Sequence, residues 1–202
     1  MIGDANVSAL PMVIVLHGSG GDEKDLLPNL KRTDASFRYI GFRGPITRGR
    51  GYRWAKGSGA TTSQAHEHYL ENLDEVAFSI AEAVDELVTK YPTTGKPTVF
   101  GFSAGAELAM FLAGSYPQNF SAIFAVAGAF PTDTVVDYFE RRSGAIVYGY
   151  ASSEDTLVSV AQTKDALEKL SEFGRATEFT EFDGGHTIPG VALDDLADYL
   201  HD

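Results

Sequence analysis

Short apolar segments alternate with stretches of helical periodicity along this chain, and this alternation constrains its fold more than any other feature. It predicts a mostly parallel β-sheet with helices on both faces. Several of the apolar segments are continuous, as expected of strands that are buried on both sides. The predicted strands are Met12–Leu16, Tyr39–Phe42, Thr98–Gly101, Ala122–Val126, Ala145–Tyr150 and Thr177–Phe182.

Helical periodicity occupies several of the stretches between these strands. Apolar residues recur at spacings of three and four in the longest stretch, which ends near Pro92, and Gly174 stands where a glycine would cap a later helix. The glycine- and arginine-rich residues Gly41–Ala60 show little periodicity and are predicted to form a loop. No repeat or linker divides the chain, so we expect one α/β domain over residues 1–202. The predicted helices are Ala65–Lys90, Ala104–Ser115, Val158–Phe173 and Ala192–Leu200.

The composition argues against several classes of protein. The chain has no cysteine, which rules out disulfides, thiolate metal sites and a cysteine nucleophile. Its formal net charge of −12 opposes binding to nucleic acid. No apolar run approaches the roughly 18–20 residues needed to cross a bilayer. The first residues include Asp4 and lack the basic and apolar regions of a secretory signal. We therefore expect a cytoplasmic protein with no membrane span, and a homodimer is compatible with the sequence.

A candidate nucleophile lies in the segment Gly101-Phe102-Ser103-Ala104-Gly105, which has the form G-x-S-x-G. A strand is predicted directly before this segment and a helix directly after it. The small flanking residues permit a sharp strand-to-helix turn, which places the serine hydroxyl at the end of the sheet and at a helix N-terminus. The context therefore predicts Ser103 as the nucleophile of a hydrolase, whereas the bare pattern would only suggest it.

A serine nucleophile needs a base, and His186 is the best placed of the five histidines. It follows Gly184 and Gly185 in a predicted loop between the last strand and the last helix, from which an imidazole can reach the end of the sheet. His66 and His68 are two residues apart and point to different faces of a helix, so we expect them to be solvated and predict no metal site. The remaining histidines are His17 and His201, the latter one residue from the end of the chain.

Acyl transfer to a serine also needs amide groups that stabilise the negative oxygen of the tetrahedral intermediate. One candidate donor is the amide of Ala104, directly after the nucleophile. The other is the amide of Ser19, in the glycine-rich turn His17-Gly18-Ser19-Gly20-Gly21 after the first predicted strand. We expect His17 to support this turn by hydrogen bonding and to take no part in proton transfer.

The ordered set of motifs resembles the phospholipase/carboxylesterase family of small α/β-hydrolases, close to bacterial carboxylesterases and acyl-protein thioesterases. The resemblance spans nearly the whole chain. It implies an α/β-hydrolase fold with a minimal, mostly parallel sheet, hydrolysis of carboxylic esters or thioesters, and no cofactor. The motifs that carry it are residues 16–26 (Leu-His-Gly-Ser-Gly-Gly-Asp-Glu-Lys-Asp-Leu), Arg43-Gly44-Pro45, Tyr52-Arg53-Trp54, Gly101-Phe102-Ser103-Ala104-Gly105 and Gly185-His186-Thr187-Ile188-Pro189.

The same resemblance implies a catalytic triad of Ser103, Asp155 and His186, with oxyanion donors at Ser19 and Ala104. The chain departs from the family at two places. Ala55 stands where an aromatic residue is common, which implies an altered acyl pocket. The loop that carries the acid is longer and lacks the usual Val-Pro pair, so Glu154 competes with Asp155 for the role of acid. Asp155 is favoured because it keeps the family's spacing to the following valine.

The predicted loop at residues 41–60 also carries candidate substrate-binding residues. Arg43, Tyr52 and Trp54 combine charge and aromatic area, so we expect them to line the substrate cleft; the alternative is that Trp54 packs in the core. The leading interpretation is a serine carboxylesterase that acts on small and medium acyl esters. A lysophospholipase, an acyl-protein thioesterase and a hydrolase-fold binding protein with little turnover remain alternatives. A dienelactone-type hydrolase is disfavoured because it would call for a cysteine.

Overall fold

A six-stranded parallel sheet forms the centre of the computed structural model, which describes residues 9–30, 36–56, 63–133 and 135–201. The strand order is β2-β1-β5-β6-β7-β8, and every neighbouring pair in it is parallel. The prediction of a mostly parallel sheet is therefore confirmed. The strands are β1 (Met12–Leu16), β2 (Arg38–Phe42), β5 (Thr98–Phe102), β6 (Ala122–Val126), β7 (Ile146–Ser152) and β8 (Thr177–Phe182).

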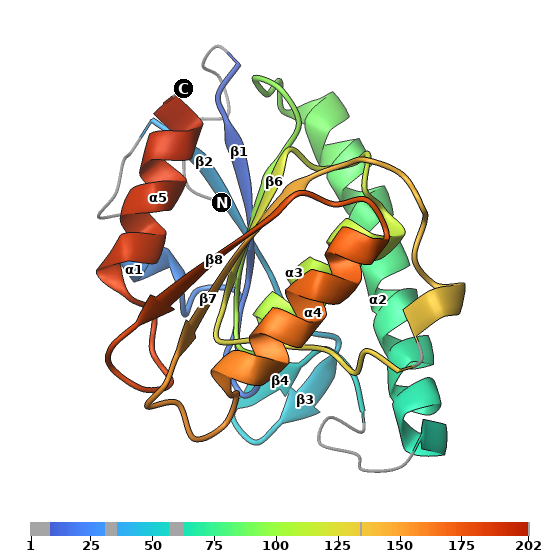
Figure 1. Ribbon diagram of the computed structural model, residues 1–202. Helices are drawn as coiled ribbons and strands as arrows, with labels where there is room; N and C mark the ends of the chain where they lie inside the picture. Colours follow the sequence, from blue (N-terminus) through green and yellow to red (C-terminus); the bar gives the residue numbers. More distant parts are fainter. Residues whose placement is uncertain (1–8, 31–35, 57–62, 134, 202) are drawn as a thin grey trace.

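Helices cover both faces of this sheet (Figure 1). Helices α1 (Leu27–Leu30) and α5 (Gly190–His201) lie on one face, and α2 (Ser63–Lys90), α3 (Ala104–Ser115) and α4 (Val160–Glu172) lie on the other. Strand β1 shows how the two cores are divided, because successive side chains of a strand point to opposite faces. Val13 and Val15 pack in the core under α1 and α5, whereas Ile14 and Leu16 pack in the core under α2, α3 and α4.

The largest difference from the predicted elements is a β-hairpin within residues 41–60. Strands β3 (Ile46–Arg48) and β4 (Gly51–Arg53) form a separate two-stranded antiparallel sheet, with Gly49 at a φ of 61° in the turn. Strands of three residues are too short to show a periodic pattern, so the segment was predicted as a loop. The helix α1 and the 3-10 turn η1 (Val135–Asp137) were missed for the same reason. Residues 57–60 of the predicted loop lie outside the described residues.

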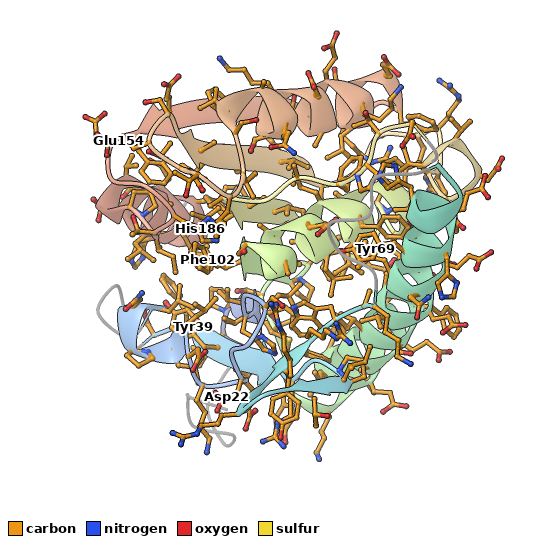
Figure 2. All side chains as sticks on the ribbon, turned by 90° about the horizontal axis from the view of Figure 1, so that it is seen from below. Asp22, Tyr39, Tyr69, Phe102, Glu154 and His186 are labelled. Carbon is orange, nitrogen blue, oxygen red and sulfur yellow. The ribbon has the colours of Figure 1, made fainter. Side chains whose placement is uncertain are left out.

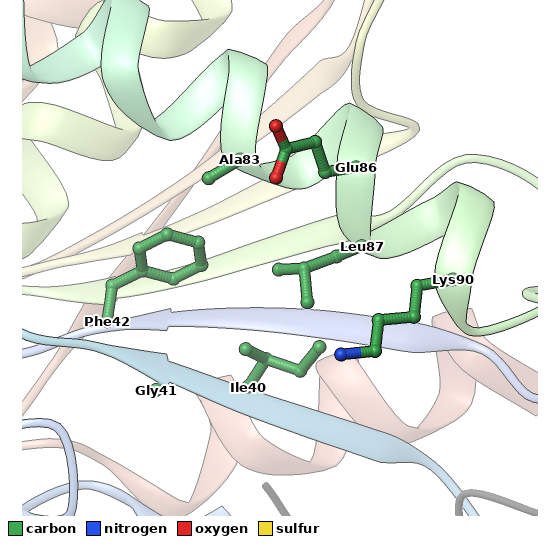
Figure 3. Close-up of a pocket in the computed structure, with 7 residues that line it drawn as sticks. All are labelled: Ile40, Gly41, Phe42, Ala83, Glu86, Leu87 and Lys90. Atoms are coloured by element: carbon green, nitrogen blue, oxygen red, sulfur yellow. The ribbon is translucent and has the colours of Figure 1, made fainter.

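The edge strand β2 borders a pocket of about 380 Å³ (Figure 3). Ile40 and Phe42 of β2 and Leu87 of α2 give this pocket an apolar lining, and Lys90 reaches toward Ile40 at the open edge of the strand. A charged side chain at an exposed edge discourages pairing with a strand of another chain. The pocket is lined by β2 and α2 and includes none of the predicted catalytic residues.

Candidate active site

Ser103 occupies a strained turn between β5 and α3. Its φ of 55° and ψ of −121° lie in a region that non-glycine residues rarely adopt. Small neighbours make this turn possible: a Cβ at Gly101 would lie 2.3 Å from the Gly105 carbonyl oxygen, and one at Gly105 would lie 2.1 Å from that of Leu16. The amide of Ser103 donates to the carbonyl of Val126 at 2.9 Å, which fixes the turn to β6. The sequence therefore needs its two glycines to present the serine at the end of the sheet.

A continuous chain of hydrogen bonds joins the three residues predicted to form the triad. Nε2 of His186 lies 2.9 Å from Oγ of Ser103, and Nδ1 of His186 lies 2.7 Å from Oδ2 of Asp155. In the view from below (Figure 2), His186 lies beside Phe102, and the centroids of their rings are 5.0 Å apart. The structure thus brings together side chains from the ends of β5, β7 and β8.

The environment of Asp155 keeps its carboxylate ionised. The side chain is fully buried, and its Oδ1 accepts the amides of Leu157 at 2.8 Å and Val158 at 3.1 Å. Burial alone would raise the pKa of Asp155, but the hydrogen bonds from His186 and from the two amides outweigh it and hold this pKa below its usual value. An ionised acceptor favours a proton on Nδ1 of His186, which leaves Nε2 free to accept the serine proton.

Glu154 lies away from this chain of hydrogen bonds. Its side chain is exposed, and its Oε2 accepts the amide of Gly184 at 3.1 Å, while Oγ of Ser152 accepts the amides of Glu154 and Gly185. Figure 2 shows Glu154 at the periphery of the molecule. Glu154 therefore connects the backbones of the two loops, and it is Asp155 that meets the imidazole.

The predicted oxyanion turn packs directly against the serine. A Cβ at Gly18 would lie 3.3 Å from Cβ of Ser103, so this position admits no side chain without a shift. Within the described residues, the amides of Ser19 and Ala104 have no hydrogen-bond acceptor. Ala104 is also the first residue of α3, where unpaired amides and the helix dipole favour a negative charge. Both predicted donors thus remain available beside Ser103.

His17 and Trp54 stabilise the predicted oxyanion turn through hydrogen bonds and ring stacking. His17 is buried, its Nε2 accepts the amide of Gly44 at 3.0 Å, and its Nδ1 lies 2.8 Å from the carbonyl oxygen of Gly18. Acceptance at Nε2 requires the proton on Nδ1, which then donates to Gly18. Trp54 is only 2% exposed; its ring stacks on His17 at 4.6 Å, and its Nε1 donates to the His17 carbonyl at 2.8 Å. The structure favours the packing alternative for Trp54 over a place in the cleft.

Arg43 and Tyr52 are engaged with each other and with Glu23. Arg43 makes two hydrogen bonds of 2.6 Å to the carboxylate of Glu23, and its guanidinium lies 4.8 Å from the centre of the Tyr52 ring. The hydrogen bonds from Arg43 lower the pKa of Glu23 to about 2. No hydrogen bond, ion pair or ring contact joins either residue to the three residues of the predicted triad, and their role in substrate binding stays a prediction.

The remaining histidines and acids suggest no metal centre in the part of the chain that is described. There, no group of three or more side chains of the metal-binding types lies close enough to hold an ion. His66 faces Asp133 and His68 faces Glu71, so the two histidines diverge as their spacing predicts. No helix of the described residues is long and apolar enough to cross a membrane.

Comparison with known proteins identifies the family. A family model described as phospholipase/carboxylesterase matches residues 2–202. The chain therefore belongs to the phospholipase/carboxylesterase family. As a member of this family it is a hydrolase that acts on carboxylic esters, and the resemblance drawn from its motifs is confirmed.

Several relatives show the extent of the likeness. Mouse lysophospholipase-like protein 1 is 24% identical over 89% of this chain and 78% of its own length. The carboxylesterase of Bacillus cereus superposes with a TM-score of 0.81 at 20% identity and covers all of this chain and 91% of its own. A carboxylesterase of Mesorhizobium loti gives 0.79 at 19% identity and covers 98% and 91% of the two chains. These structures share the α/β-hydrolase fold of this member of the family.

Sequence reasoning missed three residues that shape the site. Gly51 packs against the oxyanion turn, Phe102 places its ring against His186, and Ser152 connects the two loops that carry Asp155 and His186. Phe102 lies within the G-x-S-x-G segment and could have been noticed there. Contacts of the other two depend on segments that are remote in the sequence, and no local pattern indicates them.

Proposed function

We propose that the protein is a serine carboxylesterase that acts on small and medium acyl esters. Oγ of Ser103 bonds to the ester carbonyl carbon as Nε2 of His186 takes the hydroxyl proton. The imidazole then protonates the alcohol oxygen as the C–O bond breaks, which leaves Ser103 acylated. Water then attacks the acyl carbon as Nε2 of His186 takes a proton from it; the bond to Oγ of Ser103 breaks, His186 returns the proton to Oγ, and the acid is released. The amides of Ser19 and Ala104 would stabilise the negative oxygen at both stages.

One observation carries this proposal above the others: the hydrogen-bonded chain from Ser103 through His186 to Asp155. Simple ligand binding does not require a nucleophile that is hydrogen-bonded to an oriented base and a buried, ionised acid. The unpaired amides of Ser19 and Ala104 add the remaining component that acyl transfer needs. Together these features support catalysis over the alternative of a binding protein.

The distribution of exposed apolar side chains supports short acyl groups. The large exposed apolar side chains of the described residues lie on four separate segments of the chain, whereas a long acyl chain needs a continuous apolar groove. These residues are Phe78, Val136, Leu157 and Val191. We therefore expect hydrolysis of acetyl to hexanoyl esters in preference to lauroyl and palmitoyl esters.

Covalent labelling tests the mechanism, and a chain-length series tests the substrate range. A fluorophosphonate should label the protein on the peptide that contains Ser103, and kcat/KM for p-nitrophenyl esters should be highest for short acyl groups. Absence of both labelling and turnover would favour the binding-protein alternative. A maximum at palmitate, with Ser103 labelled, would keep the mechanism and favour a lysophospholipase or thioesterase.

A further inference from the structure

The β3–β4 hairpin presents two arginines on the same face as Gly51. In its antiparallel register Arg48 pairs with Gly51, and Ile46 pairs with Arg53. Directly paired side chains share a face, and residues two apart on a strand share it too. Arg48, Gly51 and Arg53 therefore lie on one face of the hairpin, and Tyr52 lies on the other.

The face that carries Gly51 is turned toward the predicted oxyanion turn. A Cβ at Gly51 would lie 1.8 Å from the carbonyl oxygen of Gly20. The backbone of Tyr52 fixes the two segments together: its carbonyl accepts the amide of Gly20 at 2.7 Å, and its amide donates to Gly21 at 2.8 Å. Arg48 reaches the turn with its side chain, because its guanidinium donates a hydrogen bond to the hydroxyl of Ser19. The guanidinium thus lies beside the residue that supplies a predicted oxyanion donor.

Both arginines on this face lack an anionic partner. Within the described residues, neither Arg48 nor Arg53 forms an ion pair, whereas Arg43 of the same segment is paired with Glu23. Nε of Arg53 is buried and has no hydrogen-bond acceptor. A buried donor without a partner destabilises a fold, so a site that retains one is suited to an acceptor from outside the chain.

The buried Arg175 gives a contrast, because all its guanidinium nitrogens have acceptors. Its guanidinium donates to five backbone carbonyls, whereas Nε of Arg53, like Nε and Nη2 of the buried Arg38, has no acceptor. The contrast is sharper because the chain carries a net charge of −12 and has many carboxylates with which Arg48 and Arg53 could pair. Two guanidinium groups without an ion pair among the described residues thus lie on the hairpin face that packs on the oxyanion turn, and this turn contacts Ser103 at Gly18.

We propose that Arg48 and Arg53 bind an anionic group of the substrate, so that the enzyme prefers esters carrying a second, ionised group. A guanidinium binds carboxylate and phosphate oxygens with the same forked geometry, and both groups fit this chemistry. The proposal rests on the proposed function, because it places the anion relative to an ester bound at Ser103. It names the class of substrate that this site selects.

Matched pairs of esters test the preference on the whole protein. One pair is monoethyl adipate and ethyl hexanoate, which differ by a carboxylate; the other is a butyryl ester of glycerol phosphate and the same ester of glycerol. We expect kcat/KM to be about tenfold higher for the charged member of at least one pair, equivalent to about 1.4 kcal/mol. The pair that shows the preference identifies the anion as carboxylate or phosphate.

Single substitutions then locate the effect. Arg48→Gln and Arg53→Gln should each lower the charged-to-neutral ratio of kcat/KM by about tenfold, mainly through KM. Arg50→Gln removes the same charge from the tip of the hairpin and should change the ratio less than about twofold. Arg48 is exposed, so its variant is expected to fold, and Arg53→Lys keeps a cation at the less exposed position and should retain part of the ratio.

Three results would overturn the anion site. Equal rates for both members of both pairs would do so, as would an effect of Arg50→Gln as large as that of Arg48→Gln, which would indicate diffuse electrostatics. Equal losses on charged and neutral esters would show that Arg48 only positions the turn. If Ser103 is labelled by a fluorophosphonate in each case, the proposed esterase stands; absence of labelling and of all hydrolysis would refute the esterase itself.

Discussion

The two sides of the candidate site are constructed differently. On the acid–base side, hydrogen bonds of 2.9 Å and 2.7 Å between side chains connect Ser103, His186 and Asp155. On the oxyanion side, the turn at residues 18–21 is held by the backbone of Tyr52 and by close packing against Gly51. The first side depends on the identity of three functional groups. The second depends on close backbone packing that leaves no room for an added side chain. We therefore expect substitutions on the first side to change chemistry alone, and those on the second to change stability as well.

Removing the proposed nucleophile should give the largest effect, and this effect should be on catalysis alone. Ser103→Ala eliminates the attacking oxygen, and kcat for ester hydrolysis should fall by about 10⁴-fold or more while the oxyanion donors sustain a residual rate. The free energy of unfolding should change by less than about 0.5 kcal/mol, because alanine keeps the Cβ and loses only the hydroxyl. Steady-state kinetics and urea unfolding measure the two quantities. An unchanged kcat in a folded variant would exclude the mechanism.

The adjacent acids Asp155 and Glu154 give a matched pair on the same side. Asp155→Asn removes the anion that orients His186, and in serine proteases the equivalent change lowers kcat by about 10⁴-fold. Glu154→Gln keeps an acceptor for the amide of Gly184 and should stay within about threefold of the wild type. The reverse ranking, with both variants folded as judged by circular dichroism, would assign the acid to Glu154.

Gly51→Ala tests the oxyanion side, where close packing leaves no room for a side chain. The added methyl group meets the Gly20 carbonyl at 1.8 Å, so the turn and the hairpin must shift apart, and we expect the amide of Ser19 to lose its position relative to Ser103. Loss of one oxyanion donor lowers kcat by about 10²–10³-fold, and overpacking costs about 1–3 kcal/mol of stability.

Gly190→Ala is the matched control, since a Cβ there meets nothing within 4 Å. That variant should keep both kcat and its unfolding midpoint. If Gly51→Ala lowered stability and left kcat intact, the hairpin would support the fold without positioning the donor, and the contrast between the two sides would fail.

The same contrast explains how far the sequence could predict this molecule. The bounds of β1, β6 and β8 were predicted to the residue. β1 and β6 are continuous apolar runs, which mark strands buried on both faces, whereas β8 is a partly exposed edge strand whose threonines and phenylalanines favour a strand. The elbow at Ser103 was recognisable because its glycines, strand and helix are contiguous in the chain. The hairpin and its packing on the oxyanion turn were not, because a clash between Gly51 and Gly20 arises only when segments about 30 residues apart meet.

Trp54 shows the same limit at a single residue. Its aromatic side chain in a glycine-rich segment suggested substrate contact, whereas the structure places it under the turn as a partner of His17. Sequence cannot separate these roles, since both use an aromatic residue near the site. The deciding facts, burial and an indole hydrogen bond to a backbone carbonyl, are tertiary.

Trp54→Phe should therefore give the smallest effect of the series and act mainly on stability. Phenylalanine keeps a ring to pack on His17 but leaves the His17 carbonyl without its donor, which costs about 1–3 kcal/mol. The turn remains paired with Tyr52, so kcat should fall less than about tenfold, and the order of preference among p-nitrophenyl esters should be that of the wild type. Phe78→Leu, at a half-exposed aromatic on α2, is the control and should leave both measurements within error. If Trp54→Phe changed the chain-length preference at unaltered stability, Trp54 would contact the substrate in the cleft. The oxyanion side would then also depend on which functional groups it carries, and not on close packing alone.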